Sequence, residues 1–324
     1  MRKIAVYTSF MTDKYRQRIK SLSSSLGFTV DFYNSDEGHS ELESRVSEYE
    51  VIFGHPPPSI LKSATSLRWL CSDFAGIEGY LDDRLWPNPS CLLSNSSGAY
   101  GASISEHVLM VSLMLLRRMP EYQAELALKK WKSFSPIRSI AGSYVLLLGT
   151  GDIGTNTARR MKALGATVVG VCRSGKHDEK NLFEKVVSVD EIESVIGCAD
   201  ILVMSLPETA QTKGILSRER IALLKPSALV INVGRGSAID QEALVDALNE
   251  GRLAGAALDV MVPEPLPADH PLWRCPNTII TPHVSGDMSL GLTCDLDVEM
   301  FCKDLSHYAA GEKLEQLVDR VRGY

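Results

Sequence analysis

The sequence predicts an α/β fold made of two doubly wound parallel-sheet domains, with the second inserted into the first. Short apolar runs alternate with segments of helical length, and this alternation is typical of a parallel sheet covered by helices. It occurs in two series, one beginning at Lys3 and the other at Ser143. The chain length of 324 residues also favours two domains over one.

The first series begins at the N-terminus. Its strands are expected at short apolar runs bounded by turn-forming residues, and its first helix at an amphipathic stretch. The expected strands are 3–7, 29–33, 50–54 and 67–71, and the expected helix is 14–26. Ser97 and Gly98 then predict a hinge.

The second series repeats this pattern. A buried helix is expected over 104–119, ahead of this series, and within the series a helix follows a glycine-rich turn and ends near Leu164. The expected strands are 144–148, 167–171, 201–205, 228–232, 256–259 and 278–281. A final helix over 288–310 lies past this sheet, so it is expected to return to the first domain.

Composition and charge exclude several classes of function. The net charge is −6 and no Lys/Arg block is present, so nucleic acid is not an expected partner. The longest apolar stretch, 108–116, is far shorter than the ~20 residues of a membrane span, and no export signal is apparent. We therefore expect a cytoplasmic protein. The seven scattered cysteines show no metal-ligand spacing and are expected to be reduced core thiols, with no metal site.

A glycine-rich turn stands between the strand 144–148 and the next helix. In this context Gly149 permits a tight turn, Gly151 permits a pyrophosphate to approach the backbone, and Gly154 permits close helix packing. The amides at the helix N-terminus, including those of Asp152 and Ile153, point at the phosphates. The pattern predicts a dinucleotide site, and the alternative is an ordinary glycine-rich turn.

The end of the next strand favours NADP(H) over NAD(H). Dinucleotide folds that use NAD usually place an acidic residue there, to hold the ribose 2′-hydroxyl. This chain has Cys172 followed by Arg173, Ser174 and Lys176, which can all hold a 2′-phosphate. NADP(H) is therefore the preferred cofactor, with NAD(H) as the second possibility. The alternative is a solvated basic loop.

Three polar residues late in the chain form a chemical set. Arg235, Glu264 and His283 each follow an expected strand, and ligands bind at the carboxyl ends of strands in open α/β sheets. Reduction of a 2-keto acid needs a cation for the carboxylate, an acid for the carbonyl oxygen and a carboxylate that keeps this acid protonated. Each residue alone is equally compatible with a surface or structural role. His107 is assigned a structural role.

The sequence resembles the D-isomer-specific 2-hydroxyacid dehydrogenase family over nearly its whole length. The motifs that carry the resemblance follow the family's order: GTGDIG at 149–154, SLPETAQTKGIL at 205–216, NVGRG at 232–236, GAALDVMVPEPLP at 255–267 and TPHVSG at 281–286. The catalytic arginine, glutamate and histidine of the family fall on Arg235, Glu264 and His283.

The resemblance implies a Rossmann coenzyme domain, residues 99–288, inserted into a flavodoxin-like substrate domain, residues 1–98 and 289–324. It assigns Phe74, Ala75 and Gly76 to the substrate carboxylate and Asp259 to the nicotinamide side. Further cofactor contacts are implied at Leu206, Pro207, Thr212, Val233, Gly234, His283 and Ser285. A homodimer through the coenzyme domains is also implied, with the apolar segment 104–119 and an arm reaching Trp131 at its interface.

The sequence departs from the family at three places. Phe74 replaces a smaller residue, Cys172 replaces the Asp of NAD-using members, and Glu78 with Gly79 alters the loop that follows Gly76. The expected function is NADPH-dependent reduction of a small 2-keto acid such as glyoxylate or hydroxypyruvate. One alternative is an NAD-linked dehydrogenase of a phosphorylated hydroxyacid. The other is a catalytically idle dinucleotide sensor that binds partners.

Overall fold

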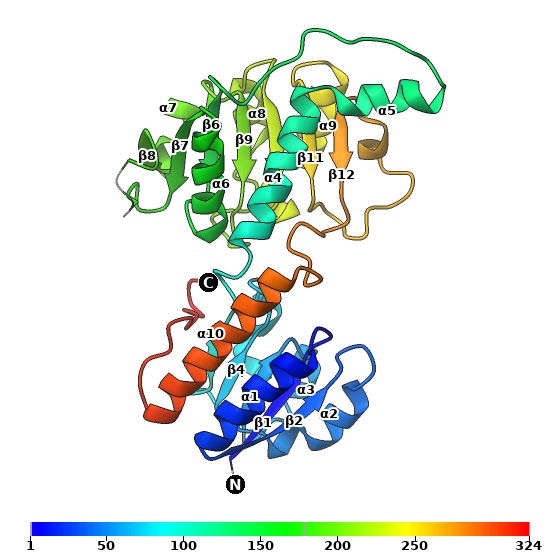
Figure 1. Ribbon diagram of the computed structural model, residues 1–324. Helices are drawn as coiled ribbons and strands as arrows, with labels where there is room; N and C mark the ends of the chain where they lie inside the picture. Colours follow the sequence, from blue (N-terminus) through cyan, green and yellow to red (C-terminus); the bar gives the residue numbers. More distant parts are fainter. Residues whose placement is uncertain (1, 178, 180, 324) are drawn as a thin grey trace. The chain divides into compact units, whose positions relative to one another are not determined.

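The computed structural model describes residues 2–177, 179 and 181–323. The chain forms two compact units, the first made of Met1–Tyr100 with Met288–Tyr324 and the second of Gly101–Asp287. The second unit is thus inserted into the first along the chain. Each unit contains one sheet, and all strand pairs in both sheets are parallel (Figure 1).

The sheet of the first unit has five strands in the order β2-β1-β3-β4-β5, which is the flavodoxin-like order. This confirms the expected fold of the unit. Its strands are β1 (Arg2–Tyr7), β2 (Phe28–Tyr33), β3 (Val51–Gly54), β4 (Trp69–Cys71) and β5 (Leu92–Ser94). Its helices are α1 (Asp13–Ser25), α2 (His39–Arg45), α3 (Pro58–Leu61) and α10 (Gly291–Ala310). The expected helix over 288–310 begins three residues late, because Leu290 is its extended N-cap.

Helices cover both faces of this sheet. Ile4 and Val6 of β1 pack on the side of α1 and α10, whereas Ala5 and Tyr7 pack on the side of α2 and α3. Successive side chains of a strand point to opposite faces, so burial on both faces requires the continuous apolar run seen in the sequence.

Two aspartates are buried together in the first unit. Asp73 follows β4 and is 5% exposed, and Asp297 lies in α10 and is 1% exposed. Burial raises the pKa of both carboxyl groups, and the charge of Asp73 raises that of Asp297 further. Asp297 accepts a hydrogen bond from the Ser96 hydroxyl. Within the described part of the chain, Asp73 Oδ1 and Asp297 Oδ2 have no hydrogen-bond partner. At least one of these carboxyl groups therefore holds a proton near neutral pH.

The sheet of the second unit has seven strands in the order β12-β11-β10-β9-β6-β7-β8, the Rossmann order with one strand added. This confirms the expected fold of the unit. The strands are β6 (Tyr144–Leu148), β7 (Thr167–Cys172), β8 (Lys185–Ser188), β9 (Ile201–Met204), β10 (Leu229–Asn232), β11 (Gly255–Leu258) and β12 (Thr278–Ile280).

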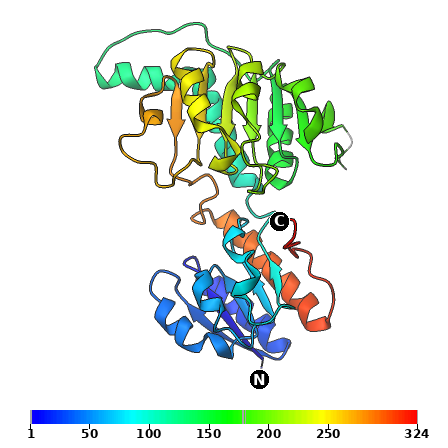
Figure 2. The same cartoon turned by 180° about the vertical axis from the view of Figure 1, so that it is seen from behind.

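Helices also cover both faces of the second sheet. Figures 1 and 2 show α4 and α6 on one face, and α7, α8 and α9 pack against the other. The bounds are α4 (Gly101–Leu116), α5 (Met119–Ala127), α6 (Asp152–Ala163), α7 (Glu193–Ile196), α8 (Arg218–Leu223) and α9 (Gln241–Asn249). The carboxyl edge of the sheet is left to loops, and these loops carry the candidate site residues.

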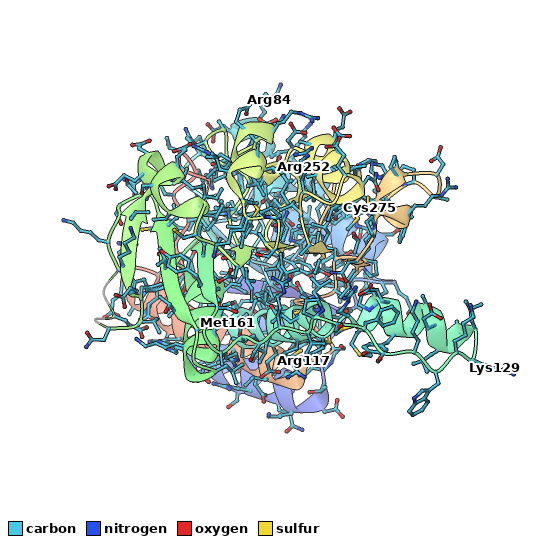
Figure 3. All side chains as sticks on the ribbon, turned by 90° about the horizontal axis from the view of Figure 1, so that it is seen from above. Arg84, Arg117, Lys129, Met161, Arg252 and Cys275 are labelled. Carbon is cyan, nitrogen blue, oxygen red and sulfur yellow. The ribbon has the colours of Figure 1, made fainter. Side chains whose placement is uncertain are left out.

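The expectation of one helix over 104–119 is wrong at its C-terminal end. Helix α4 ends at Leu116, because Arg118 adopts a left-handed conformation with φ of 60°, and α5 begins at Met119. Helix α5 buries none of its residues. Figure 3 shows it on an arm that extends away from the sheet of the second unit, with Lys129 at the far end.

Two further expectations concern membranes and cysteines. Among the described residues, no helix is both long enough and apolar enough to cross a membrane. The cysteines are free thiols, and five of them are buried. The expectation of core thiols is wrong for Cys198, which is exposed, and for Cys172, which is half-buried at the end of β7.

Candidate active site

The three candidate catalytic residues follow adjacent strands of the second unit. Arg235 lies after β10, Glu264 after β11 and His283 after β12, and these strands are neighbours in the sheet. Because the strands are parallel, the three loops leave the same edge. Gly236 contributes to this assembly, since a Cβ on it would lie 2.3 Å from the Met261 carbonyl carbon. The turn carrying Arg235 thus packs directly on the loop that leads to Glu264.

Glu264 and His283 form a hydrogen-bonded pair. His283 Nδ1 lies 2.9 Å from Glu264 Oε2, and the other carboxyl oxygen, Oε1, accepts the Met261 amide at 2.9 Å. A carboxylate oxygen accepts, so Nδ1 is the donor and Nε2 is left for a ligand. The His283 side chain is 51% exposed and the Glu264 side chain is 37% exposed. This is the arrangement expected of an acid whose ring is held by a carboxylate.

Asp259 holds the backbone of the loop that carries His283. This carboxylate is 2% exposed, and it accepts the Val284 amide through Oδ1 and the Ser285 amide through Oδ2, each at 3.0 Å. Its main-chain oxygen accepts the His283 amide at 2.9 Å. Burial raises the pKa of Asp259, but hydrogen bonds from Ser285, Thr281 and Val284 outweigh burial and leave it below the ordinary value. The side chains of Asp259 and Ser285 thus hydrogen-bond to each other, and Asp259 also accepts hydrogen bonds from the loop backbone.

Arg235 is positioned by a turn that sequence reasoning missed. Asn232, fully buried at the end of β10, accepts the Gly234 amide at 3.1 Å and donates to the Arg235 carbonyl at 2.9 Å. The guanidinium is partly exposed, and its Nη1 donates to the Gly234 carbonyl at 2.8 Å. A buried asparagine in an otherwise apolar strand was the signal for this role.

The glycine-rich turn has the geometry that a dinucleotide site needs. A Cβ on Gly154 would lie 2.0 Å from the Gly149 carbonyl oxygen, and Gly149 itself has φ of 104°. Both positions therefore require glycine for internal packing. A Cβ on Gly151 would meet nothing within 4 Å. The space in front of Gly151 is thus open at the N-terminus of α6, which fits a pyrophosphate.

Two other expected cofactor residues lie in the first turn of α6. Asp152 is its first residue and Ile153 its second, so their amides belong to the N-terminal amides of the helix. The Asp152 side chain instead interacts with the protein, because Oδ1 accepts from Asn156 Nδ2 at 2.9 Å. Burial raises the pKa of Asp152. Its fit to an anion therefore rests on the backbone amide and not on the carboxyl group.

The loops after β9 and β10 pack closely on each other. A Cβ on Gly234 would lie 2.7 Å from the Leu206 amide nitrogen, and Val233 donates its amide to the Met204 carbonyl at 3.0 Å. The Thr212 hydroxyl donates to the Pro207 carbonyl at 2.6 Å. Thr212 therefore shapes the loop at Pro207, and the structure brings these expected cofactor residues to the same sheet edge as the glycine-rich turn.

The basic loop after β7 is exposed. Arg173, Ser174 and Lys176 are exposed, and Ser174 Oγ accepts the Lys176 amide at 3.3 Å. Cys172 Sγ lies 3.5 Å from Ser174 Oγ. Burial raises the pKa of Cys172, but hydrogen bonds from Ser174 and Thr150 outweigh it and leave the pKa below the ordinary thiol value. The loop thus presents two cationic residues and a hydroxyl to the solvent.

The expected carboxylate loop lies in the first unit, after β4. Phe74 and Ala75 are exposed, and Asn95 Nδ2 fixes the loop by donating to the Ala75 carbonyl at 2.8 Å. Within the described part of the chain, the Ala75 and Gly76 amides donate to no backbone carbonyl in the turns and loops. The His55 ring packs against the Phe74 ring in a T-shaped arrangement, with a centroid distance of 4.8 Å. These two amides suit an anionic group.

Together, a Rossmann-type unit, an open glycine-rich turn and a Glu–His pair beside an arginine define a dinucleotide-dependent oxidoreductase. Comparison with known proteins identifies the family. Residues 109–285 match the model of the D-isomer-specific 2-hydroxyacid dehydrogenase NAD-binding domain. The chain is 30% identical over 287 residues to glyoxylate/hydroxypyruvate reductase A of Serratia proteamaculans, covering 87% of this chain and 89% of the relative.

Solved structures show the same likeness over the whole chain. A D-isomer-specific 2-hydroxyacid dehydrogenase family protein from Aeromonas salmonicida has a TM-score of 0.84 and 32% identity, covering 98% of this chain and 99% of that one. The NADPH-dependent glyoxylate/hydroxypyruvate reductase from Sinorhizobium meliloti, bound to NADP and sulfate, has a TM-score of 0.80 and 25% identity, covering 100% of both chains. The chain belongs to the D-isomer-specific 2-hydroxyacid dehydrogenase family, so the family resemblance is confirmed. Its cofactor is a nicotinamide dinucleotide.

Proposed function

We propose that the protein is an NADP(H)-dependent reductase that converts a small 2-keto acid, such as glyoxylate or hydroxypyruvate, into the D-2-hydroxy acid. The observation that carries the proposal is the His283–Glu264 pair on the same sheet edge as Arg235. Relatives named as glyoxylate/hydroxypyruvate reductases support the choice of substrate. The domain of residues 99–288 binds the cofactor, and residues 1–98 with 289–324 form the substrate domain.

The candidate catalytic and substrate-binding residues each have a defined role in this proposal. Arg235 binds the substrate carboxylate and its carbonyl oxygen through a planar guanidinium. His283 donates a proton from Nε2 to the carbonyl oxygen, while Glu264 holds the ring at Nδ1. Phe74, Ala75 and Gly76 form the substrate loop, in which backbone amides bind the carboxylate. The bound nicotinamide supplies the hydride.

The residues of the second unit fit the cofactor. The open face of Gly151 accepts the pyrophosphate, and the exposed Arg173, Ser174 and Lys176 hold the 2′-phosphate of NADP(H). NAD(H), which lacks this phosphate, gains nothing from the two cations. The preference for NADP(H) therefore rests on this loop.

The cofactor preference predicts the outcome of a charge reversal. Arg173→Asp is expected to lower kcat/KM for NADPH about ten- to a hundredfold, because a charge-assisted contact to the 2′-phosphate is lost, and to leave NADH activity close to wild type. The measurement is the initial rate of glyoxylate and hydroxypyruvate reduction with each cofactor. Arg252→Asp is the matched control, since Arg252 is exposed and pairs with Glu250.

Other outcomes of the same assay identify the alternatives. Equal use of both cofactors by the wild type would contradict the NADP(H) assignment. Activity confined to NADH and a phosphorylated hydroxyacid would support the NAD-linked dehydrogenase. No turnover of any 2-keto acid, together with cofactor binding, would support the sensor.

We also propose that the protein is a homodimer paired through the arm of the coenzyme domain. Leu126, Leu128 and Trp131 on this arm are 64%, 63% and 104% exposed, and such an apolar surface is typical of an interaction site. Sedimentation velocity is expected to give the dimer mass for the wild type and a monomer for Leu126→Glu/Trp131→Glu. A monomeric wild type at micromolar concentration would contradict the proposal.

A further inference from the structure

A hydrogen-bond chain connects helix α4 to the loop that carries His283. His107 on α4 has its Nε2 atom 3.4 Å from Thr281 Oγ1, and Thr281 Oγ1 lies 2.5 Å from Asp259 Oδ1. The Asp259 carboxylate then accepts the amides of Val284 and Ser285. All five residues belong to the second unit.

The direction of each hydrogen bond follows from the charge of Asp259. Hydrogen bonds leave the pKa of this buried carboxyl below its ordinary value, so it is ionised and can only accept. The Thr281 hydroxyl must therefore donate to Asp259, and its oxygen remains free to accept. The atom facing that oxygen is His107 Nε2. The proton of a neutral His107 ring thus lies on Nε2.

The charge state of His107 agrees with this direction. Burial lowers the pKa of His107, and the charge of Asp259 partly opposes that shift. Glu106, the adjacent carboxylate on α4, is exposed and faces Arg160 at 3.6 Å. The ring is therefore neutral above its lowered pKa and carries one proton, which the chain places on Nε2.

The hydrogen-bond chain from His107 ends at His283, whose backbone has an unfavourable conformation. His283 has φ of 55°, a left-handed conformation that is unfavourable for a residue with a side chain. Its amide and the two that follow it donate to the main chain or side chain of Asp259. A change in the orientation of the Asp259 carboxylate therefore changes where the His283 ring lies.

We propose that His107 is a positioning residue for His283. Its Nε2 proton orients the Thr281 hydroxyl toward Asp259, and Asp259 in turn fixes the loop 281–285 so that His283 Nε2 faces the substrate. The inference rests on the proposed role of His283 as the acid. It replaces the purely structural role that the sequence predicts for His107.

The test compares His107→Leu with His107→Gln. Leucine fills the space but cannot donate, whereas the glutamine amide places a donor near the position of Nε2. His107→Leu is expected to lower kcat about tenfold with the KM for NADPH unchanged, as for the loss of one hydrogen bond. His107→Gln is expected to recover most of this loss. Glu106→Gln, next to it on the same helix, is the control with wild-type kcat.

Thr281→Val tests the same proposal at the next residue of the hydrogen-bond chain. It breaks the chain at the next link, so it should lower kcat as His107→Leu does, and the double variant should lose no more than either single one. Independent, multiplicative losses would overturn the proposal. So would a wild-type kcat for His107→Leu, or a glutamine variant as slow as the leucine variant.

Two controls separate this inference from the proposed function. If His283→Ala keeps the wild-type rate, the acid assignment fails, whereas a slow His283→Ala with a normal His107→Leu overturns only the role of His107. Long-range ¹H–¹⁵N spectra of histidine-labelled protein need no turnover. They are expected to show His107, assigned by its loss in His107→Gln, as the Nε2–H tautomer. The Nδ1–H tautomer would overturn the proposal even if a variant folds poorly.

Discussion

Replacing His283 by alanine is expected to lower kcat for reduction of the best 2-keto acid by about 10²–10⁴-fold, the usual contribution of a positioned general acid. The physical reason is that Nε2 is the proton donor placed by the Glu264 hydrogen bond at Nδ1. Steady-state kinetics at saturating NADPH measure the effect. Cofactor affinity, followed by NADPH fluorescence, is expected to fall far less than kcat, because the Gly149–Gly154 turn is unchanged.

The Glu264→Gln variant distinguishes the role of His283 as proton donor from the role of Glu264, which orients its ring. Glutamine keeps the size of the side chain and retains an oxygen that can accept from His283 Nδ1, but it loses the negative charge. We therefore expect a smaller loss of kcat than in His283→Ala. Near-normal reduction by His283→Ala would show that the proton comes from another group.

Arg235→Lys is expected to lower kcat/KM for the keto acid by about 10²–10³-fold, the usual effect of removing a donor aimed at a polarised oxygen. A guanidinium offers paired donors in one plane, and an ammonium on a flexible chain does not reproduce this geometry. Lysine also loses the Nη1 contact to the Gly234 carbonyl, which fixes the side chain.

Arg252→Lys is the matched control for this substitution, since it makes the same chemical change in the turn after α9. The dissociation constant of NADPH should be the same in both variants. A lysine variant with the wild-type kcat/KM for its best keto acid would contradict the assignment of Arg235 to the substrate.

Most strands of both sheets could be predicted because burial on two faces demands a continuous apolar run. Strand β6 matches its expected bounds, 144–148, at both ends. Strand β8 was missed because it is a four-residue edge strand that begins with Lys185 and ends with Ser188. Strand β5, whose apolar residues are Leu92 and Leu93, was also missed. The end of α4 depends on the left-handed Arg118, which hydrophobic periodicity does not report.

The candidate site residues could be predicted where a reactive polar side chain follows a strand. Arg235, Glu264 and His283 could be found because each comes directly after an apolar run. The residues that position these side chains could not be predicted, because they contact each other across long sequence separations. His107 and Thr281, for example, are 174 residues apart. Asn232 was missed for a different reason: a single asparagine in an apolar run is a signal for a buried polar contact, but it equally marks an ordinary strand end.

The buried pair Asp73 and Asp297 makes the folding of the first unit a proton-uptake reaction. An unfolded aspartate releases its proton near pH 4, whereas burial keeps at least one proton on the folded pair at higher pH. Between about pH 4 and the raised pKa of the folded pair, the folded unit binds more protons than the unfolded chain. Its free energy of unfolding therefore falls as pH rises through this range. The slope is about 1.4 kcal/mol per pH unit for one proton. Rising pH within this range thus lowers the free energy of unfolding of the unit that carries the loop Phe74–Gly76, independently of any proton used in the reduction.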